Sequence, residues 1–361
     1  MEQSYLSTEA LSVGYRGEAL IRDISISVRR GEILTLIGPN GAGKSTILKS
    51  LIRQLKLVSG VVVLDGKNLE ELSERELSTR LSVLMTDRIR PELMTCEDVV
   101  ATGRYPYTGR LGILSEHDRD VVRSAMERVH AWELRDRDFG EISDGQRQRV
   151  LLARAVCQEP EIIVLDEPTS FLDIRHKLEL LTLLKEMVQT ENLAVILSLH
   201  ELDLAQRISD RVVCVKGDRI ALFGTPEEVF RDSYIHELYG MTNGSYQSAY
   251  GTVELERVCG EPQVFVIGGG GSGIPVYREL QRRGIPFAAG ILPENDLDYP
   301  AAKALAARLI SVPAFHPLEE ALEEAKDVLQ SCKEVRCCVQ SFGAQNEANR
   351  ILQTLATEKS K

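Results

Sequence analysis

The sequence has little of what marks several large classes of protein. No apolar run reaches the ~18 residues of a membrane-spanning helix, and the N-terminal residues 1–4 lack the basic and apolar stretches of a secretory signal. Basic residues are outnumbered, with 43 Lys and Arg against 54 Asp and Glu and a net charge of −11, which argues against a nucleic-acid partner. The 7 cysteines are odd in number and scattered, which indicates reduced thiols rather than a disulfide framework. We therefore expect a cytosolic protein.

What the chain does have is length and an ordinary globular composition. Its 361 residues are 43% hydrophobic and 27% charged, enough for two or three domains with their own cores. We place a first domain in residues 1–250, with a largely helical part at about 91–160. A turn-rich stretch over 239–260 is the best linker candidate, and we set the linker itself at 251–262. Residues 263–361 form the second domain.

A glycine-rich loop follows the apolar strand 33–37 and precedes a helical pattern that begins at Ser45. It fits the phosphate-loop pattern G-x-x-x-x-G-K-[ST] in the context that this pattern requires. The residues of the loop and its flank are Gly38, Pro39, Asn40, Gly41, Ala42, Gly43, Lys44, Ser45 and Thr46. We expect backbone N–H groups and the helix N-terminus to bind a nucleotide's phosphates here, with Lys44 on the β- and γ-phosphates and Ser45 on Mg²⁺. The alternative is a glycine-rich turn that binds nothing.

Two adjacent carboxylates, Asp166 and Glu167, end the continuous apolar strand 162–165. Such a pair is often no more than a solvated strand end. In a chain with a phosphate loop, we expect Asp166 to hold Mg²⁺ and Glu167 to polarise the attacking water.

Further motifs follow in an order that resembles the ATP-binding subunit of an ABC transporter over roughly residues 1–250. Ser143, Asp144, Gly145 and Gln146 resemble its signature motif, and Ser170 to Asp173 resemble its D-loop. His200 ends an apolar strand, as the family's switch histidine does, and Tyr15 stands 23 residues before Gly38, where the family has an adenine-stacking aromatic.

The resemblance implies an α/β fold, an ABC-type P-loop ATPase with a RecA-like core, an antiparallel β subdomain and a helical subdomain. It also implies a homodimer that sandwiches ATP and Mg²⁺, in which the signature residues of one subunit contact the γ-phosphate held by the other. His200 then holds that phosphate and positions Glu167, and Asp173 links the two sites. The implied location is the cytoplasmic face of the membrane, as a peripheral protein.

Two positions depart from the family's pattern. Position 144 is Asp where the family usually has Gly, which puts a carboxylate near a phosphate at a Coulomb cost of ~1 kcal/mol or more. Thr86 stands where the Q-loop glutamine is expected; its oxygen can still reach Mg²⁺ or a water, but its side chain is shorter.

The kind of transporter is indicated by residues 101–107, which resemble a segment of ATPases that serve importers of iron–siderophore, haem and cobalamin complexes. We read Arg104 and Tyr105 as exposed anchors on a turn. Implied partners are two integral-membrane permease subunits, contacted through the Q-loop and the Tyr105 region, and indirectly an extracytoplasmic substrate-binding protein. The bland interpretation is a solvated loop.

The second domain has four strand–helix units, which predict a small parallel α/β sheet of Rossmann-like type. Its loop 268–273 fits G-x-G-x-x-G through Gly268, Gly270 and Gly273, and Glu294 lies where a ribose-binding acid would stand. A polyglycine run matches almost any glycine spacing, so an unknown nucleotide competes here with a regulatory or dimerising domain that has no ligand.

Two alternatives to an importer ATPase remain at this stage. One is a soluble, non-transport ABC ATPase. The other is an importer ATPase gated by a ligand of the second domain.

Overall fold

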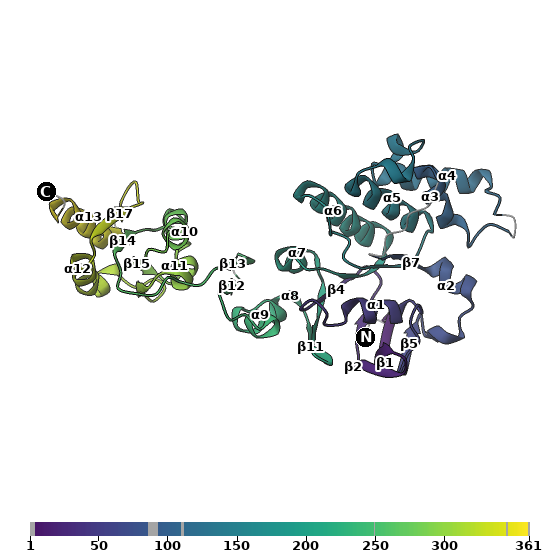
Figure 1. Ribbon diagram of the computed structural model, residues 1–361, viewed down its shortest axis with the longest axis horizontal. Coiled ribbons are helices and arrows are strands. Elements are labelled where there is room, and N and C mark those ends of the chain that lie inside the picture. The colour runs from purple at the N-terminus through teal and green to yellow at the C-terminus, as the bar shows by residue number, and fades with distance from the viewer. Residues whose placement is uncertain (1–3, 86–92, 110–111, 249, 344–345, 360–361) are drawn as a thin grey trace. The chain divides into compact units, whose positions relative to one another are not determined.

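The computed structural model describes residues 4–85, 93–109, 112–248, 250–343 and 346–359. The chain divides into two compact units, the first ending at Tyr234 and the second beginning at Ile235 (Figure 1). The exact domain limits stay a prediction. Within the described ranges, no helix combines the length and the apolar character needed to traverse a bilayer.

Unit 1 is built on one large sheet with the strand order β6-β5-β1-β2-β11-β10-β4-β9-β8-β7, and β3 pairs with β1. Strands β10, β4, β9, β8 and β7 run parallel to one another, whereas β1 pairs antiparallel with β2, β3 and β5. The strands are β1 (Leu6–Tyr15), β2 (Glu18–Ile24), β3 (Ser27–Val28), β4 (Ile33–Ile37), β5 (Ser59–Leu64), β6 (Lys67–Asn68), β7 (Leu81–Leu84), β8 (Ile162–Leu165), β9 (Ala194–Ser198), β10 (Arg211–Lys216) and β11 (Arg219–Gly224). The combination of a parallel core and an antiparallel part agrees with the expected fold class.

The central strands β4, β8 and β9 are buried along their whole length. A parallel strand covered on both faces has no polar side, which explains the continuous apolar runs from which two of them were predicted. Because parallel strands end at the same sheet edge, the segments that follow β4, β8 and β9 meet there. Those segments carry the phosphate loop, Asp166 with Glu167, and His200.

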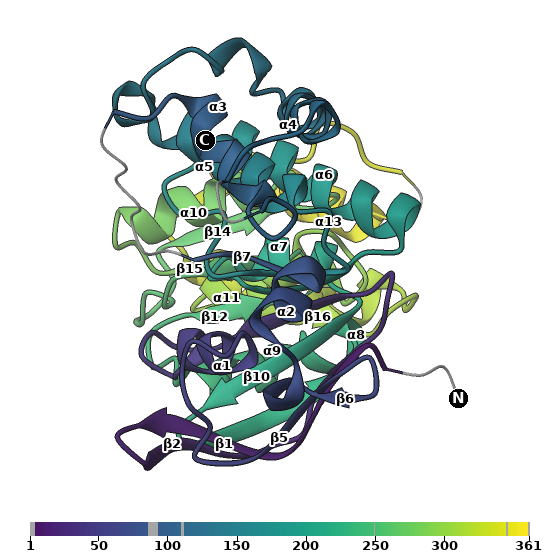
Figure 2. The same ribbon diagram turned by 90° about the vertical axis from the view of Figure 1, so that its right-hand side faces the viewer.

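The helices of unit 1 include three that gather at the end away from β1, β2 and β5 (Figures 1 and 2). These three are α3 (Cys96–Ala101), α4 (Glu116–Arg128) and α5 (Asp144–Cys157), each opened by a capping box. They lie within the segment expected to be helical. The other helices of unit 1 are α1 (Lys44–Leu51), α2 (Glu74–Arg80), α6 (Ile174–Glu191), α7 (Leu202–Ile208) and α8 (Pro226–Val229), whereas α9 (Asp232–Tyr239) begins in unit 1 and ends in unit 2.

Unit 2 contains a four-stranded parallel sheet in the order β16-β15-β14-β17. Its elements are β14 (Val264–Ile267), α10 (Ile274–Arg282), β15 (Phe287–Pro293), α11 (Tyr299–Leu305), β16 (Arg308–Val312), α12 (Leu322–Ser331), β17 (Glu334–Cys337) and α13 (Glu347–Lys359). Alternate strand residues enter two apolar clusters, one shared with α12 and α13 and one with α10 and α11. The sheet is therefore covered on both faces, and the predicted parallel α/β domain is confirmed.

The segment predicted as a linker is partly ordered. Strands β12 (Ser245–Gln247) and β13 (Thr252–Glu254) form a hairpin within it. Tyr246 is buried, and the Glu254 carboxylate pairs with Arg278 of α10. The glycine and serine content that suggested a linker belongs to the turns around this hairpin.

Candidate functional site

The phosphate loop leads from β4 into α1, whose N-cap is Gly43. Gly43 has φ 93°, and a Cβ there would lie 2.5 Å from Ile21 Cδ1, so both the backbone conformation and the packing require glycine. The buried Lys44 ammonium donates to the carbonyls of Gly38 at 2.8 Å and Pro39 at 3.2 Å. Burial lowers the pKa of Lys44, and the carboxylates of Glu167 and Asp166 oppose that shift. The lysine is thus held over the loop close to both acids.

Tyr15, at the end of β1, lies beside this loop. Its side chain is exposed, and its hydroxyl lies 3.3 Å from Thr46 Oγ1. A flat aromatic face next to the start of α1 is suited to stacking on a base.

Asp166, Glu167 and His200 come together at the carboxyl ends of β8 and β9. His200 Nε2 lies 2.5 Å from Glu167 Oε1. The Asp166 side chain is buried, whereas those of Glu167 and His200 are partly exposed. Glu167 has a left-handed φ of 49°, which turns the chain sharply at the strand end. The predicted base, Glu167, and the predicted switch histidine, His200, are therefore in direct side-chain contact.

Ser198, which the sequence did not single out, connects the two acids. This fully buried residue of β9 donates its hydroxyl to Asp166 Oδ1 at 2.7 Å and accepts the Glu167 backbone N–H at 2.9 Å. Its only signal in the sequence is a hydroxyl in an otherwise apolar strand, two residues before the histidine.

A second missed group lies around Glu201. Its carboxylate accepts from Thr169 at 3.0 Å and from Lys177 of α6 at 2.5 Å. Burial would raise the pKa of Glu201, but the hydrogen bonds from Lys177 and Thr169 outweigh it and lower the pKa. This network ties the segment after β9 to the segment after β8.

The signature-like residues open α5. Ser143 is its N-cap: Ser143 Oγ accepts the Gln146 N–H, and Gln146 Oε1 accepts the Ser143 N–H. A Cβ on Gly145 would lie 3.6 Å from His176 Nδ1, so the start of α5 adjoins the start of α6. Asp173 caps α6 and accepts the His176 N–H, a bond that lowers the pKa of Asp173. Thr86, the substitute for the Q-loop glutamine, lies outside the described residues.

The loop around Tyr105 requires one correction. Tyr105 is exposed, as expected, but Arg104 is buried and pairs with Asp118 at 2.9 Å and Glu159 at 2.7 Å. Its guanidinium also lies over the ring of Tyr107. The expectation of an exposed arginine anchor is therefore wrong, because two carboxylates and a carbonyl draw the side chain inward, where it secures the loop.

In unit 2, the glycine loop after β14 is bonded to the chain's own carboxylates. The fully buried Asp298 accepts from the N–H groups of Gly269 at 2.6 Å, Gly273 at 2.8 Å and Ile274 at 3.2 Å. Asp296 accepts the Gly270 N–H at 3.0 Å. Burial raises the pKa of Asp298, and the N–H groups of Gly273 and Gly269 oppose that shift. Three N–H groups of the loop, of the kind that bind a phosphate in a dinucleotide loop, thus donate to these two carboxylates.

The other residues of this candidate site also have internal roles. A Cβ on Gly268 or Gly273 would overlap the buried Tyr277 hydroxyl, so close packing explains both glycines. Glu294 follows β15, and its carboxylate lies 3.4 Å from the Tyr299 hydroxyl.

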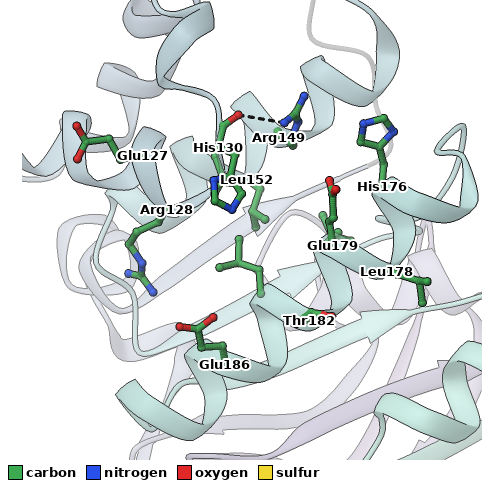
Figure 3. A pocket seen from close by; sticks show the side chains of 13 residues that line it. Glu127, Arg128, His130, Arg149, Leu152, His176, Leu178, Glu179, Thr182 and Glu186 are labelled. Atoms are coloured by element: carbon green, nitrogen blue, oxygen red, sulfur yellow. Dashed lines mark hydrogen bonds between the residues drawn. The ribbon is translucent and has the colours of Figure 1, made fainter.

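A surface cavity of about 710 Å³ lies among α4, α5 and α6 (Figure 3). His130, Arg149 and His176 line it, and Arg149 donates to the His130 carbonyl at 3.0 Å. None of the predicted nucleotide-binding residues belongs to its lining. The catalytic candidates therefore lie at the sheet edge rather than in this cavity.

Comparison with known proteins matches both units. The family model described as ABC transporter covers residues 21–170, and the MJ0874 family covers residues 287–361. The ABC transporter ATP-binding protein MJ0873 of Methanocaldococcus jannaschii is 42% identical, over 80% of this chain and 99% of its own length. A probable siderophore transport system ATP-binding protein, YusV of Bacillus subtilis, is 38% identical over 67% of this chain and 88% of its own. The cobalamin import ATP-binding protein BtuD of Halobacterium salinarum is 33% identical over 87% and 80%.

A solved structure agrees with these relatives. MJ1267, an ATP-binding cassette of an ABC transporter in its ADP conformation, matches with a TM-score of 0.58 and 25% identity, over 65% of this chain and 98% of that one. The chain therefore belongs to the ABC transporter family, as an ATP-binding subunit whose ATPase activity is coupled to transport.

Proposed function

We propose that this chain powers the import of a metal-chelate type substrate, of the siderophore or cobalamin class, by ATP-driven closure of a homodimer. Two relatives that align over most of this chain are named for siderophore transport and cobalamin import. As a subunit of an ABC transporter, the chain requires a membrane-embedded permease as its partner. We assign the permease contact to the exposed Tyr105 on the loop that Arg104 secures.

The observation that carries the proposed chemistry is the cluster of Glu167, His200 and Ser198. Glu167 is the general base that takes a proton from the attacking water, through the carboxylate that His200 contacts at 2.5 Å. Ser198 holds the backbone of Glu167 and the carboxylate of Asp166 in one arrangement. The base is thus positioned before it acts.

The nucleotide and its metal fit the residues around this cluster. Lys44, Gly38 to Gly43 and Tyr15 would hold the phosphates and the base of ATP, and Ser45 and Asp166 would hold Mg²⁺. Asp166 is buried, and it lies close to Lys44, whose pKa is lowered by burial. A bound cation would neutralise the Asp166 carboxylate, and bound phosphates would pair with the Lys44 ammonium. When bound, Mg²⁺ neutralises charge on the phosphate oxygens.

We assign no nucleotide to unit 2, because Asp296 and Asp298 accept the N–H groups of its glycine loop that a phosphate would need. We place the site of action at the cytoplasmic face of the membrane, where Asp173 links the two ATP sites.

Substitution of the proposed base is the first test. Glu167→Gln removes the proton acceptor but keeps the shape, so we expect ATP hydrolysis to fall about 100-fold or more while ATP binding persists. The variant should form an ATP-dependent dimer, measured by size-exclusion chromatography with light scattering. Glu179→Gln, which changes an exposed glutamate paired with Arg175, is the matched control. A monomeric variant with full activity would contradict the role of Glu167.

The transport assignment has its own test. The tagged full-length chain is purified from detergent-solubilised membranes, and the proteins that accompany it are identified by mass spectrometry. We expect a polytopic permease. Recovery of ribosomal or soluble partners alone would favour a non-transport ABC ATPase and leave the ATPase chemistry intact.

A further inference from the structure

The signature-like motif places a carboxylate where this chain must also accept a phosphate. Asp144 is the first residue of α5, and its side chain is half exposed. A negative charge in the first turn stabilises a helix, but it competes with any other anion at the same helix end. The Asp144 carboxylate must therefore be neutralised or turned aside if the γ-phosphate of ATP is to approach this helix end.

Asp144 is not needed to cap the helix. Ser143 is the N-cap, and its oxygen accepts the Gln146 N–H at 3.3 Å while Gln146 Oε1 accepts the Ser143 N–H at 3.0 Å. An oxygen that accepts in this way still has its hydroxyl proton to donate. The capping pair therefore fixes the helix end and leaves Ser143 a donor for a phosphate.

Arg147, one turn further along, holds the Asp144 carboxylate. Arg147 Nη1 lies 2.5 Å from Asp144 Oδ1, and Nη2 donates to the Ile142 carbonyl at 3.3 Å. The guanidinium carbon also lies 5.6 Å from the centre of the buried Phe139 ring. The Ile142 carbonyl and the Phe139 ring thus hold the guanidinium in place, and the guanidinium in turn holds the Asp144 carboxylate.

We propose that Arg147 is a positioning residue that neutralises Asp144 and holds it aside, so that the N-terminus of α5 can contact the γ-phosphate bound to the second subunit. This inference rests on the proposed function. Without Arg147, an uncompensated negative charge would stand next to the incoming phosphate and weaken ATP-driven dimerisation. Without Asp144, Arg147 would no longer be needed for this purpose.

A double-mutant cycle tests the pair. All variants carry Glu167→Gln, and the ATP concentration that gives half-maximal dimer is measured by light scattering at fixed protein and Mg²⁺ concentrations. We expect Arg147→Ala to raise this concentration about tenfold in the presence of Asp144, and less than about threefold when Asp144→Gly is also present. Arg147→Lys keeps the charge but not the geometry of the guanidinium. It should therefore need an ATP concentration between that of the protein with Arg147 and that of Arg147→Ala.

Two controls separate this effect from a loss of structure. Arg123→Ala removes an exposed arginine of α4 that is also paired with a glutamate, and it should leave dimerisation unchanged. The thermal unfolding midpoint of each variant is measured without nucleotide. Adding Asp144→Gly to Arg147→Ala should not raise this midpoint, although it restores dimerisation.

The outcomes distinguish the inference from the function on which it rests. If Glu167→Gln alone stays monomeric with ATP, the proposed function is wrong, and so is the inference. If it dimerises but Arg147→Ala dimerises equally well, only the inference fails. If Arg147→Ala weakens the dimer and Asp144→Gly does not restore it, Arg147 acts by some means other than Asp144, and the inference is again wrong.

Discussion

At the scale of single residues, Ser198 is where the structure adds most to the site. A hydrogen bond from a buried hydroxyl to a carboxylate contributes about 1.5–3 kcal/mol to stability. Here the same hydroxyl also accepts the backbone N–H of the proposed base, Glu167. We expect Ser198→Ala to lower kcat for ATP hydrolysis about 10- to 100-fold with little change in ATP affinity, measured by steady-state kinetics and by nucleotide titration. Ser82→Ala on β7 is the matched control, because this buried serine hydroxyl has no hydrogen-bond partner among the residues that the structure describes. Equal effects of the two substitutions would contradict the role of Ser198.

The second residue-scale prediction concerns Asp118. Hydrogen bonds from Ser115, and then the Arg104 guanidinium, lower the pKa of Asp118 to about 2. Because the folded-state pKa lies below the unfolded one, this carboxylate stabilises the protein above about pH 4 and loses that contribution as the pH falls toward 2. We expect Asp118→Asn to lower the free energy of unfolding by about 2 kcal/mol at pH 7, and by progressively less below about pH 4. Urea unfolding over a pH series measures both quantities.

The control for Asp118 is Asp98→Asn. Asp98 closes a capping box at the start of α3 with the same pattern of bonds, but it is exposed, and within the described ranges no arginine pairs with it. Its loss should therefore cost less. If the two variants lose the same stability, the buried ion pair with Arg104 contributes nothing beyond the cap.

At the scale of elements, β14, its glycine loop and α10 depend on close packing around Tyr277. A Cβ on Gly268 would overlap the Tyr277 hydroxyl, which is buried and accepts or donates no hydrogen bond within the described part of the chain. We expect Gly268→Ala to destabilise unit 2 by about 2–3 kcal/mol, and Tyr277→Phe to restore only part of that loss, because it removes the nearer oxygen but leaves Asp298 Oδ2 at 2.9 Å from the added Cβ. Thermal unfolding measures both effects. Gly343→Ala, where a Cβ would meet nothing within 4 Å, should be close to neutral.

A different outcome would change the interpretation of this loop. If Gly268→Ala leaves stability unchanged, packing does not account for the glycine. A ligand requirement for that glycine would then have to be considered again.

At the scale of the whole molecule, the described residues of each unit form apolar clusters of their own; one such cluster includes strands of the large sheet, and two others cover the faces of the small sheet. We expect calorimetry of the full-length Glu167→Gln protein to show two transitions. Mg²⁺ and ATP at saturating concentration should raise the transition of unit 1 by about 5–10 °C and leave that of unit 2 unchanged. Gly268→Ala identifies the transition of unit 2. A shift of both transitions would indicate a nucleotide in unit 2 or strong coupling between the units.

Much of the fold could be read from the sequence because the strongest signals are local. The apolar strands predicted over residues 33–37 and 162–165 are β4 and β8, and the structure has them at these residues. Helix α2 and strand β11 were not predicted, since α2 buries little apolar surface and β11 is only partly covered. Their stability comes from neighbouring elements that a local pattern does not reveal.

For the site, the sequence determined which chemical groups are present and in what order, because the phosphate loop, the two acids after β8 and the histidine after β9 each follow a strand directly. Only the tertiary structure decided how these groups are held. Ser198 connects the two acids across neighbouring strands, Arg104 turns inward to Asp118 and Glu159, and Asp298 occupies a loop that looked ready for a phosphate. Each of these contacts joins residues that are 14 to 55 positions apart, and the distances that decide them exist only once the chain has folded.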